Sequence, residues 1–336
     1  DVHIFEEHKE IGKPVQCTGI ISKNLKQIIP VDKFLINKVT GAVFYSKHNR
    51  FNLKTDKLQA YIVDRSKMDR WLAKEAKKAG VKIYLNRTFG SFTKTKKKLR
   101  ISFENKTQKP FVCDILIGAD GPISKVAKTA GLYSKRDFLV GIQAIVNGKF
   151  DPKQVQIYLG TVCPDFFAWV VPESSTRARI GLATKKGANA RFKKFLAMFP
   201  DLRVQEYQGG LIPLFKEIKL KKDNIFLVGD AALQVKATTG GGVVTGLLAG
   251  EALAKSLIKN KSYSKELKKL NRELKITRMI RKSLNRFNDN KYDSLIELID
   301  KPKIKNLLQK YGDMDFPTKF IFKILFKEPR LLRFFF

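Results

Sequence analysis

The sequence predicts an α/β protein, α+β in its overall content, in which a parallel sheet is interrupted by an antiparallel sheet and followed by a helical C-terminal region. Two segments predict the parallel sheet. At 115–126 and 225–258, a short apolar run ends in a turn with glycine and aspartate and then enters a helix. Short strand-like segments between 139 and 222 predict the antiparallel insert. We therefore divide the chain into units 1–138, 139–222, 223–260 and 261–336.

The length, composition and charge of the chain limit the classes of function that it can have. At 336 residues the chain can bury a large core, and its length favours two domains. The formal net charge of +35 comes from lysines scattered along the whole sequence. Such a surface keeps a protein soluble or attracts it to anionic membranes and polyphosphates. No nucleic-acid-binding module accompanies the charge, so we predict no nucleic-acid partner.

Cysteine and histidine are sparse. Cys17, Cys113 and Cys163 lie far apart, which predicts neither a disulfide framework nor a metal site and fits a reducing cytoplasm. The histidines have no supporting Ser/His/Asp motif. No apolar run reaches the ~18 residues that a membrane-spanning helix needs. The sequence thus predicts a cytoplasmic protein, with peripheral membrane contact left open.

The first strand covers residues 1–5 and ends at Glu6. In a dinucleotide-binding βαβ unit an acidic residue ends the second strand and binds a ribose, a role that Glu6 fits; a solvated charge is the alternative. The glycine-rich loop that should precede this strand does not occur anywhere in the sequence. We therefore expect a chain that lacks about 30 residues. If the chain is complete, the phosphates of a dinucleotide lose their main binding loop.

Two loops and a helix come next, in the order expected for a dinucleotide-binding domain. Glycines and a proline around Cys17 indicate a loop at the carboxyl edge of the sheet, where a lone cysteine is most often a small buried thiol. Residues 64–80 predict a helix that Asp64 caps and Gly80 ends, with Arg65 in its first turn. Further on, Asp120 either bonds its own turn or faces a ligand at the sheet edge.

The stretch 224–258 organises the rest. Asp230 ends a buried strand, and Gly240, Gly241 and Gly242 remove every side chain just before an apolar helix. A ligand can therefore approach the bare N–H groups of that helix, where an anion would be stabilised. The alternative is a glycine-rich turn that packs a helix closely on a sheet, with Asp230 as an N-cap.

In this order the motifs resemble those of the geranylgeranyl reductase family, within the p-hydroxybenzoate hydroxylase superfamily. The resemblance implies a Rossmann-like, FAD-binding parallel sheet, truncated at its N-terminus. It puts Asp230 at the ribityl chain, and Asp120 and Gly121 at the pyrophosphate. It also puts the helix start, Gly240, Gly241, Gly242 and Val243, at the pyrimidine side of the flavin. Leu233 and Ala237 depart from the glycine and proline that are common in the family.

Two further matches imply residues beside the flavin ring. Gly12, Pro14 and Gly19 flank Cys17 as in the family's Gly-x-Pro-Val-x-Cys-x-Gly stretch, so Cys17 becomes a candidate cofactor contact and the candidate catalytic residue. Arg65 begins a segment similar to Arg-x-x-Phe-Asp-x-x-Leu, which makes it a candidate cofactor contact rather than a solvated charge.

The insert carries the candidate substrate residues. The segment 167–172 and the glycine at 181 resemble a family pattern that lines an isoprenoid pocket, which implies a substrate site at Phe167, Trp169, Pro172 and Gly181. Phe167 replaces a tyrosine, so a hydroxyl is lost, and aromatics on strands are usually core. From 316 to the end, phenylalanines alternate with lysines and arginines, as in a membrane-interfacial helix or a helix pair packed on the domain.

The resemblance implies a function. The implied function is that of an FAD-dependent reductase, which saturates carbon–carbon double bonds in isoprenoid chains, including those of membrane lipid precursors. A ferredoxin or a nicotinamide would be the external electron donor. An FAD monooxygenase with the same fold and a flavin-free lipid carrier are the alternatives. The sequence does not single out a proton donor.

Overall fold

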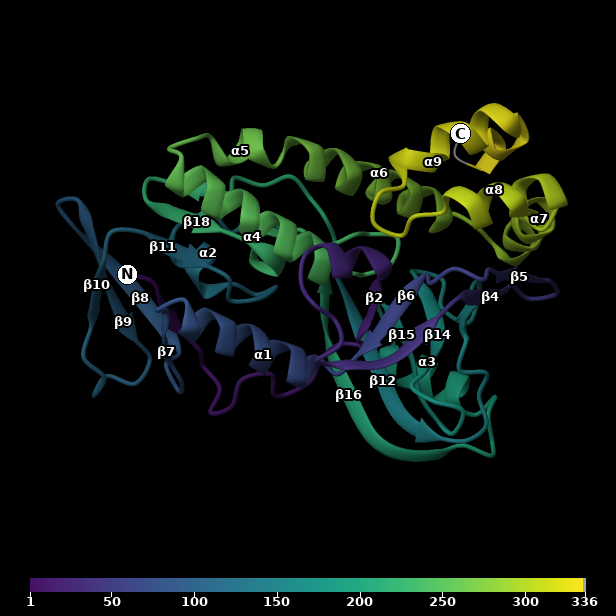
Figure 1. The fold of residues 1–336 in the computed structure, drawn as a ribbon, viewed down its shortest axis with the longest axis horizontal. Coiled ribbons are helices and arrows are strands. Elements are labelled where there is room, and N and C mark those ends of the chain that lie inside the picture. The colour runs from purple at the N-terminus through teal and green to yellow at the C-terminus, as the bar shows by residue number, and fades with distance from the viewer. Residues whose placement is uncertain (335–336) are drawn as a thin grey trace.

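The two strand–turn–helix segments meet in one small sheet. The computed structural model describes residues 1–334 (Figure 1). In it β11 (Leu116–Gly118) and β18 (Ile225–Leu227) are parallel neighbours, with β17 (Lys221–Lys222) antiparallel at the edge. Because both parallel strands end at the same edge, turns 110 residues apart in sequence come together there. The predicted parallel sheet is confirmed.

The rest of the first unit surrounds this sheet. β1 (His3–Phe5) pairs in parallel with β7 (Lys82–Tyr84), and β8 (Phe89–Thr95), β9 (Lys98–Phe103) and β10 (Phe111–Cys113) form an antiparallel layer. β2 (Ile20–Ser22), β6 (Ala60–Val63) and β3 (Leu35–Val39) form a third small sheet. Next to it lie the short helix η1 (Lys23–Gln27) and α1 (Arg65–Lys78). Asp64 caps α1 as predicted, since its side chain accepts from the Lys67 N–H.

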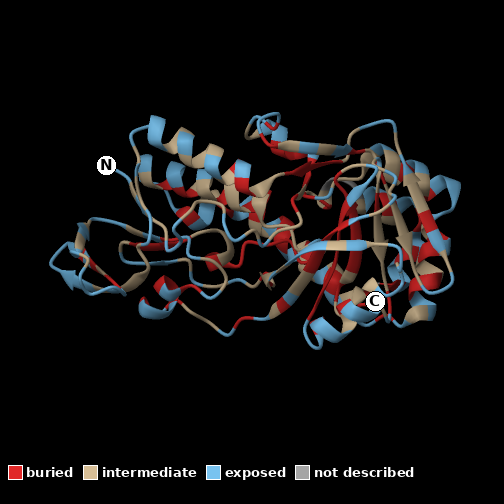
Figure 2. Ribbon diagram, turned by 90° about the horizontal axis from the view of Figure 1, so that it is seen from below, coloured by how far each residue is buried: buried red, intermediate tan, exposed pale blue. Residues whose placement is uncertain are grey.

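The large sheet has seven strands. Its order is β16 (Arg203–Pro213), β12 (Phe138–Asn147), β15 (Arg177–Thr184), β14 (Phe167–Pro172), β13 (Gln154–Tyr158), β4 (Gly41–Tyr45) and β5 (Arg50–Lys54). The expected antiparallel layer is present, but it is not built from 139–222 alone. β4 and β5 join its edge, and β4 runs parallel to β13. Buried residues of this sheet form a hydrophobic core cluster, and Figure 2 shows the buried parts of the chain in red.

Helices cover the sheets. α2 (Lys125–Thr129) follows β11 and α4 (Val243–Ile258) follows the glycine triple, while α3 (Ala188–Leu196) packs on the large sheet. The C-terminal region forms α5 (Tyr263–Glu266), α6 (Lys268–Leu284), α7 (Asp289–Ile299), α8 (Pro302–Tyr311), α9 (Thr318–Lys327) and η3 (Pro329–Phe334). α6 runs beside α4, and α7 to α9 gather near β4 and β5 (Figure 1). None of the helices in the described part of the chain has the length and apolarity to cross a membrane.

Candidate functional site

One cavity lies where the small sheets, the large sheet and the C-terminal region meet. Its lining comes from residues 16–22, from β12, β13 and β14, from residues 208–212, from Lys236 and the turn 239–244, and from Met314 with Asp315. Apolar atoms dominate its walls, and the polar groups come mainly from loops. The site therefore combines apolar walls with polar groups from the loops around them, as small-molecule sites commonly do.

Asp230 lies in the turn η2 (Gly229–Ala232), directly after β18. Burial raises the pKa of its carboxyl from 3.8 to about 6, although the charge of Arg65 acts in the opposite direction. Within the described residues no hydrogen bond to this carboxylate is found. A half-buried carboxylate without donors is a cost to the folded protein unless a ligand supplies them.

The N-terminus of α4 is bare. Gly242 is its N-cap and offers no side-chain acceptor, so the first N–H groups are free of a protein cap. A methyl group added at Gly242 would lie 3.0 Å from Oδ1 of Asp230, and Gly240 has a φ of +67°, which favours glycine. Val243 begins the helix and lines the cavity. Glycine is thus required here for close approach as well as for the turn.

The two departures from the family pattern have visible consequences. Leu233 has a φ of 59°, in the left-handed region, which explains why glycine is common at this position. The N–H of Ala237 donates to Oγ1 of Thr277 at 3.3 Å, a hydrogen bond that proline could not make.

Arg65 lies beside Cys17 and Asp230. Its Nη2 donates to both carboxylate oxygens of Asp69, at 3.0 and 3.2 Å, while its Nε is buried without a partner. Burial lowers the pKa of Arg65, but Cys17 and Asp69 raise it by more. Cys17 lies half-buried in the cavity wall, and its Sγ accepts from the Gly19 N–H at 3.3 Å. Three of the predicted residues therefore converge.

Glu6 and Asp120 are engaged by their own loops. Asp120 accepts from the Ser124 hydroxyl at 2.5 Å and from the Val126 N–H at 2.9 Å, so its carboxylate holds the start of α2. Glu6 ends β1 and accepts from the N–H and the ring of His8. For Asp120 these contacts favour the alternative that it bonds its own turn, and Glu6 is bound by His8 instead of being only solvated. The backbone at Gly121 stays open, with no atom within 4 Å of an added methyl group.

Three buried arginines hold the loops around the cavity, and none was predicted. Arg136 donates to the carbonyls of Pro122 and Ala231, at 2.8 and 2.9 Å, and so joins the two strand-end turns. Burial lowers the pKa of Arg136. Arg281 binds the carbonyls of Ala237 and Thr238, just before the glycine triple. Because isolated arginines carry no local pattern, the sequence offered no signal for them.

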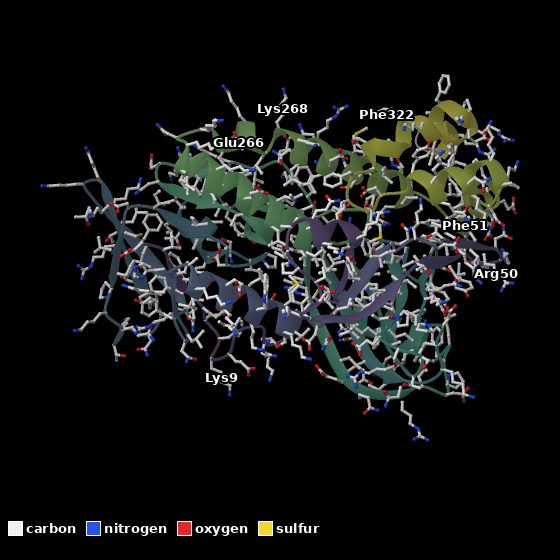
Figure 3. The ribbon with its side chains drawn as sticks, in the orientation of Figure 1. Lys9, Arg50, Phe51, Glu266, Lys268 and Phe322 are labelled. Carbon is white, nitrogen blue, oxygen red and sulfur yellow. The ribbon has the colours of Figure 1, made fainter. Side chains whose placement is uncertain are left out.

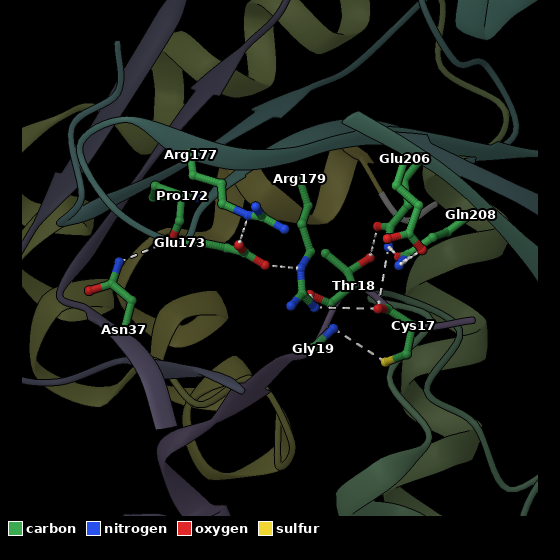
Figure 4. A network of polar contacts seen from close by, with 11 residues as sticks. Cys17, Thr18, Gly19, Asn37, Pro172, Glu173, Arg177, Arg179, Glu206 and Gln208 are labelled. Atoms are coloured by element: carbon green, nitrogen blue, oxygen red, sulfur yellow. Dashed lines mark hydrogen bonds and ion pairs between the residues drawn. The ribbon is translucent and has the colours of Figure 1, made fainter. Parts of the chain in front are cut away.

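The third, Arg179, anchors the Cys17 loop (Figure 4). Its Nη1 donates to the Thr18 carbonyl at 2.6 Å, and its Nε pairs with Glu173 at 2.6 Å. A second chain of contacts runs from the Thr18 hydroxyl to Gln143 and on to Gln208, at 2.9 and 2.7 Å. The large sheet thus fixes the position of Cys17 through its neighbour in the loop.

The candidate substrate residues divide into two pairs. Phe167 and Trp169 line the cavity, and the Trp169 Nε1 is buried without a partner. Gly181 lies behind the indole, where a methyl group would be 2.7 Å from its Cζ2. Pro172 is at the far end of β14, and its carbonyl accepts from Asn37. Gly181 and Pro172 therefore shape the sheet but are not among the residues that line the cavity.

The residues fit a flavin nucleotide. The open start of α4 can receive a ring edge that gains negative charge, and the unpaired Asp230 carboxylate can accept from hydroxyl groups. The Arg65 Nε is a free donor beside them. Phe167, Trp169 and Val171 of β14 add apolar side chains to the cavity that the start of α4 lines.

Comparisons with known proteins agree with this geometry. A family model described as "FAD binding domain" matches residues 25–191. The chain is 32% identical to the uncharacterized protein MJ1520 of Methanocaldococcus jannaschii, over 96% of this chain and 89% of the relative. It is 28% identical to digeranylgeranylglycerophospholipid reductases of M. jannaschii and Methanococcus vannielii, over 99% of this chain and 90% of each.

Among solved structures, the fold is similar to a geranylgeranyl bacteriochlorophyll reductase-like protein from Thermoplasma acidophilum. The TM-score is 0.82 at 22% identity, and the match covers 98% of this chain and 90% of that one. The flavin-dependent halogenase CmlS matches with a TM-score of 0.65 at 15% identity, over 98% and 66% of the two chains.

Proposed function

The chain belongs to the geranylgeranyl reductase family of FAD-dependent oxidoreductases, and from this premise we propose that it saturates carbon–carbon double bonds in the isoprenoid chains of lipids. One observation carries the proposal: the bare start of α4 and the apolar strand β14 line one and the same cavity. Such a cavity can hold an alkene against a flat cofactor.

The chain's own residues hold the cofactor. We assign the ribityl hydroxyls to Asp230, whose carboxylate lacks other donors, and the ring edge to the N–H groups after Gly242. Arg65 provides a further donor. When bound there, FAD supplies the two-electron chemistry of the reaction.

The remaining walls hold the substrate and exclude water. Phe167, Trp169 and Ile212 give an apolar surface to an isoprenoid chain. In such a site, electrostatic effects on the reacting atoms are stronger than in water. Gln143 and Gln208 also line the cavity, and the amide of Gln143 donates to the Cys17 carbonyl and to the side-chain oxygen of Gln208.

We assign the delivery of the proton to Cys17. Saturation of a double bond adds one hydride and one proton. The S–H of Cys17 is a proton donor in the cavity wall. Arg65 lies beside this thiol, and the thiolate that remains regains a proton from solvent.

The test uses the FAD-loaded protein, a chemical reductant and a phospholipid with geranylgeranyl chains, followed by mass spectrometry of the lipid. The proposal expects a gain of two hydrogen atoms per double bond. A gain of oxygen in the presence of air and a nicotinamide would indicate the monooxygenase instead. An unchanged lipid with tightly bound FAD would contradict the substrate assignment. Comparison of a ferredoxin with a nicotinamide as reductant identifies the electron donor.

We also propose that α9 contacts an anionic membrane, which is where the lipid substrate lies. Phe322 and Phe326, one helical turn apart, are 59% and 87% exposed, and Phe322 lies at the outer surface (Figure 3). Lys323 and Lys327 lie next to them, so rings can enter the interface while cations meet lipid phosphates. Phe335 and Phe336 lie outside the described residues, as do the side chains of Lys319 and Phe320.

Vesicle sedimentation tests the membrane contact. Replacement of Phe322 and Phe326 by Ser should release the protein from vesicles that contain anionic lipid. Met279→Ser, on α6, is a matched control because Met279 is also exposed, at 64%. Equal binding of all variants would contradict the role of α9.

A further inference from the structure

Arg281 is a buried cation without a buried anion. Only 4% of the residue is exposed, and among the described residues no carboxylate forms an ion pair with it. Its partners are the carbonyls of Ala237, Thr238 and Phe166, at 3.1, 2.9 and 3.3 Å. Burial lowers the pKa of the guanidinium to about 10, so it keeps its charge near neutral pH. Buried charges are normally paired, so this one needs an explanation.

The cation lies directly behind the cavity wall. Its guanidinium carbon is 4.6 Å from the centre of the Phe166 ring, and Phe166 lines the cavity. The same ring faces Gly240, where an added methyl group would be 3.3 Å from its Cζ. One aromatic ring therefore separates the guanidinium from the cavity, on the side of the glycine turn.

Arg281 also acts on the loop that leads into this turn. Thr277, one helical turn earlier on α6, accepts from the N–H of Ala237, and Arg281 binds the Ala237 carbonyl. Both polar groups of this residue are thus fixed by the same face of α6. Since proline is usual at this position in the family, these two contacts replace the rigidity that a proline ring would give.

We propose that Arg281 is a positioning residue of the FAD site that also supplies fixed positive charge to the flavin. The guanidinium holds the turn 237–242 in place, and its unpaired charge has the same sign as the bare start of α4. Both favour an isoalloxazine that has gained negative charge over a neutral one, and in a buried site such charges are weakly screened. The proposal rests on the FAD site and needs no assumption about the lipid substrate.

The test measures the reduction potential of bound FAD, without substrate, in wild type and three variants. Arg281→Met removes the charge and the loop contacts, and should shift the reduction equilibrium about tenfold towards oxidised FAD, about 30 mV for a two-electron couple. Arg281→Lys keeps a charge and loses the fork-shaped donor, so the potential should stay near wild type while FAD binds more weakly. Thr277→Val should weaken FAD binding without changing the potential.

A purely structural Arg281 predicts another result: the Lys and Met variants would have the same potential, or the potential would follow FAD affinity across all three variants. Either outcome overturns the proposal. The wild-type protein gives a second measurement, which does not depend on whether a variant folds. Its reduced FAD should show the anionic spectrum at a pH where free reduced FAD is still neutral. A neutral spectrum there would also overturn the proposal.

Discussion

Replacement of Asp230 by Asn should stabilise the FAD-free protein and weaken FAD binding at the same time. The raised pKa of Asp230 means that the folded protein holds this proton more tightly than the unfolded chain does. Its contribution to stability therefore falls as the pH rises from 3.8 to about 6, and it stays low above that range. The displacement of the pKa corresponds to at most about 3 kcal/mol.

Asn is neutral at every pH and avoids this cost. We expect the variant without FAD to be more stable than wild type by about 1–3 kcal/mol at about pH 8, and equally stable at about pH 4. Urea unfolding followed by circular dichroism measures both differences. Because the two side chains have nearly the same shape, packing changes should be small.

FAD binding should respond in the opposite direction. Ribityl hydroxyls donate best to an ionised carboxylate, so the FAD affinity of wild type should rise as the pH passes about 6, whereas that of the variant should stay flat. Loss of one hydrogen bond to a charged group weakens binding by about tenfold or more at about pH 8. Fluorescence titration with FAD tests this. A wild-type affinity that is independent of pH, or equal urea midpoints at the higher pH, would refute the reasoning.

Three other changes test separate parts of the site. Gly242→Ala should weaken FAD binding at least tenfold. The new methyl group would lie 3.0 Å from the Asp230 carboxylate, and this close contact exists with or without the cofactor. Asp315→Ala should lower the free energy of unfolding by about 3–5 kcal/mol, because it leaves the buried ammonium of Lys236 without its partner. A small alkylating reagent should modify Cys17 in the FAD-free protein and less so with FAD bound, while Cys163, fully buried and with its pKa raised to about 11, stays unmodified.

Each change has its own control. Gly250→Ala lies on α4 with no atom within 4 Å of the new methyl group, so it should bind FAD normally; a loss equal to that of Gly242→Ala would contradict the close-approach argument. The double variant Lys236→Met/Asp315→Leu should recover much of the stability lost by Asp315→Ala, and no recovery would mean that the loss comes from packing. Equal alkylation of Cys17 with and without FAD would place its thiol away from the cofactor.

Local signals predicted local structure well. The helix 243–258 was predicted with the bounds that α4 has, because the glycine triple and the apolar run after it are contiguous in sequence. The helical region 261–336 was predicted without the bounds of its helices, although Asn288 marks the start of α7: it is the N-cap and accepts from the Lys291 N–H at 2.9 Å. The lysines and asparagines around it hid the apolar face that Leu295, Ile296 and Ile299 give to the helix.

Long-range pairings were beyond the sequence. Nothing in residues 41–45 indicates that they pair in parallel with β13, more than a hundred residues later, because strand register is set by the partner strand and not by the local pattern. For the same reason β4 and β5 were not expected in the large sheet. The arrangement of the site could not be predicted for the same reason, since its rim consists of loops that are attached to different sheets.

The arginines show why charge in a sequence is hard to interpret. The chain carries 66 lysines and arginines, and most are exposed, where salt screens them and their individual contribution is small. In the sequence Arg136 and Arg281 cannot be told apart from the exposed arginines. In the structure they are buried, bind backbone carbonyls, and have no carboxylate partner among the described residues. Their charge is weakly screened, and Arg281 lies behind the Phe166 ring that lines the cavity. The net charge of the sequence therefore gives no indication of these few buried cations, which only the fold identifies.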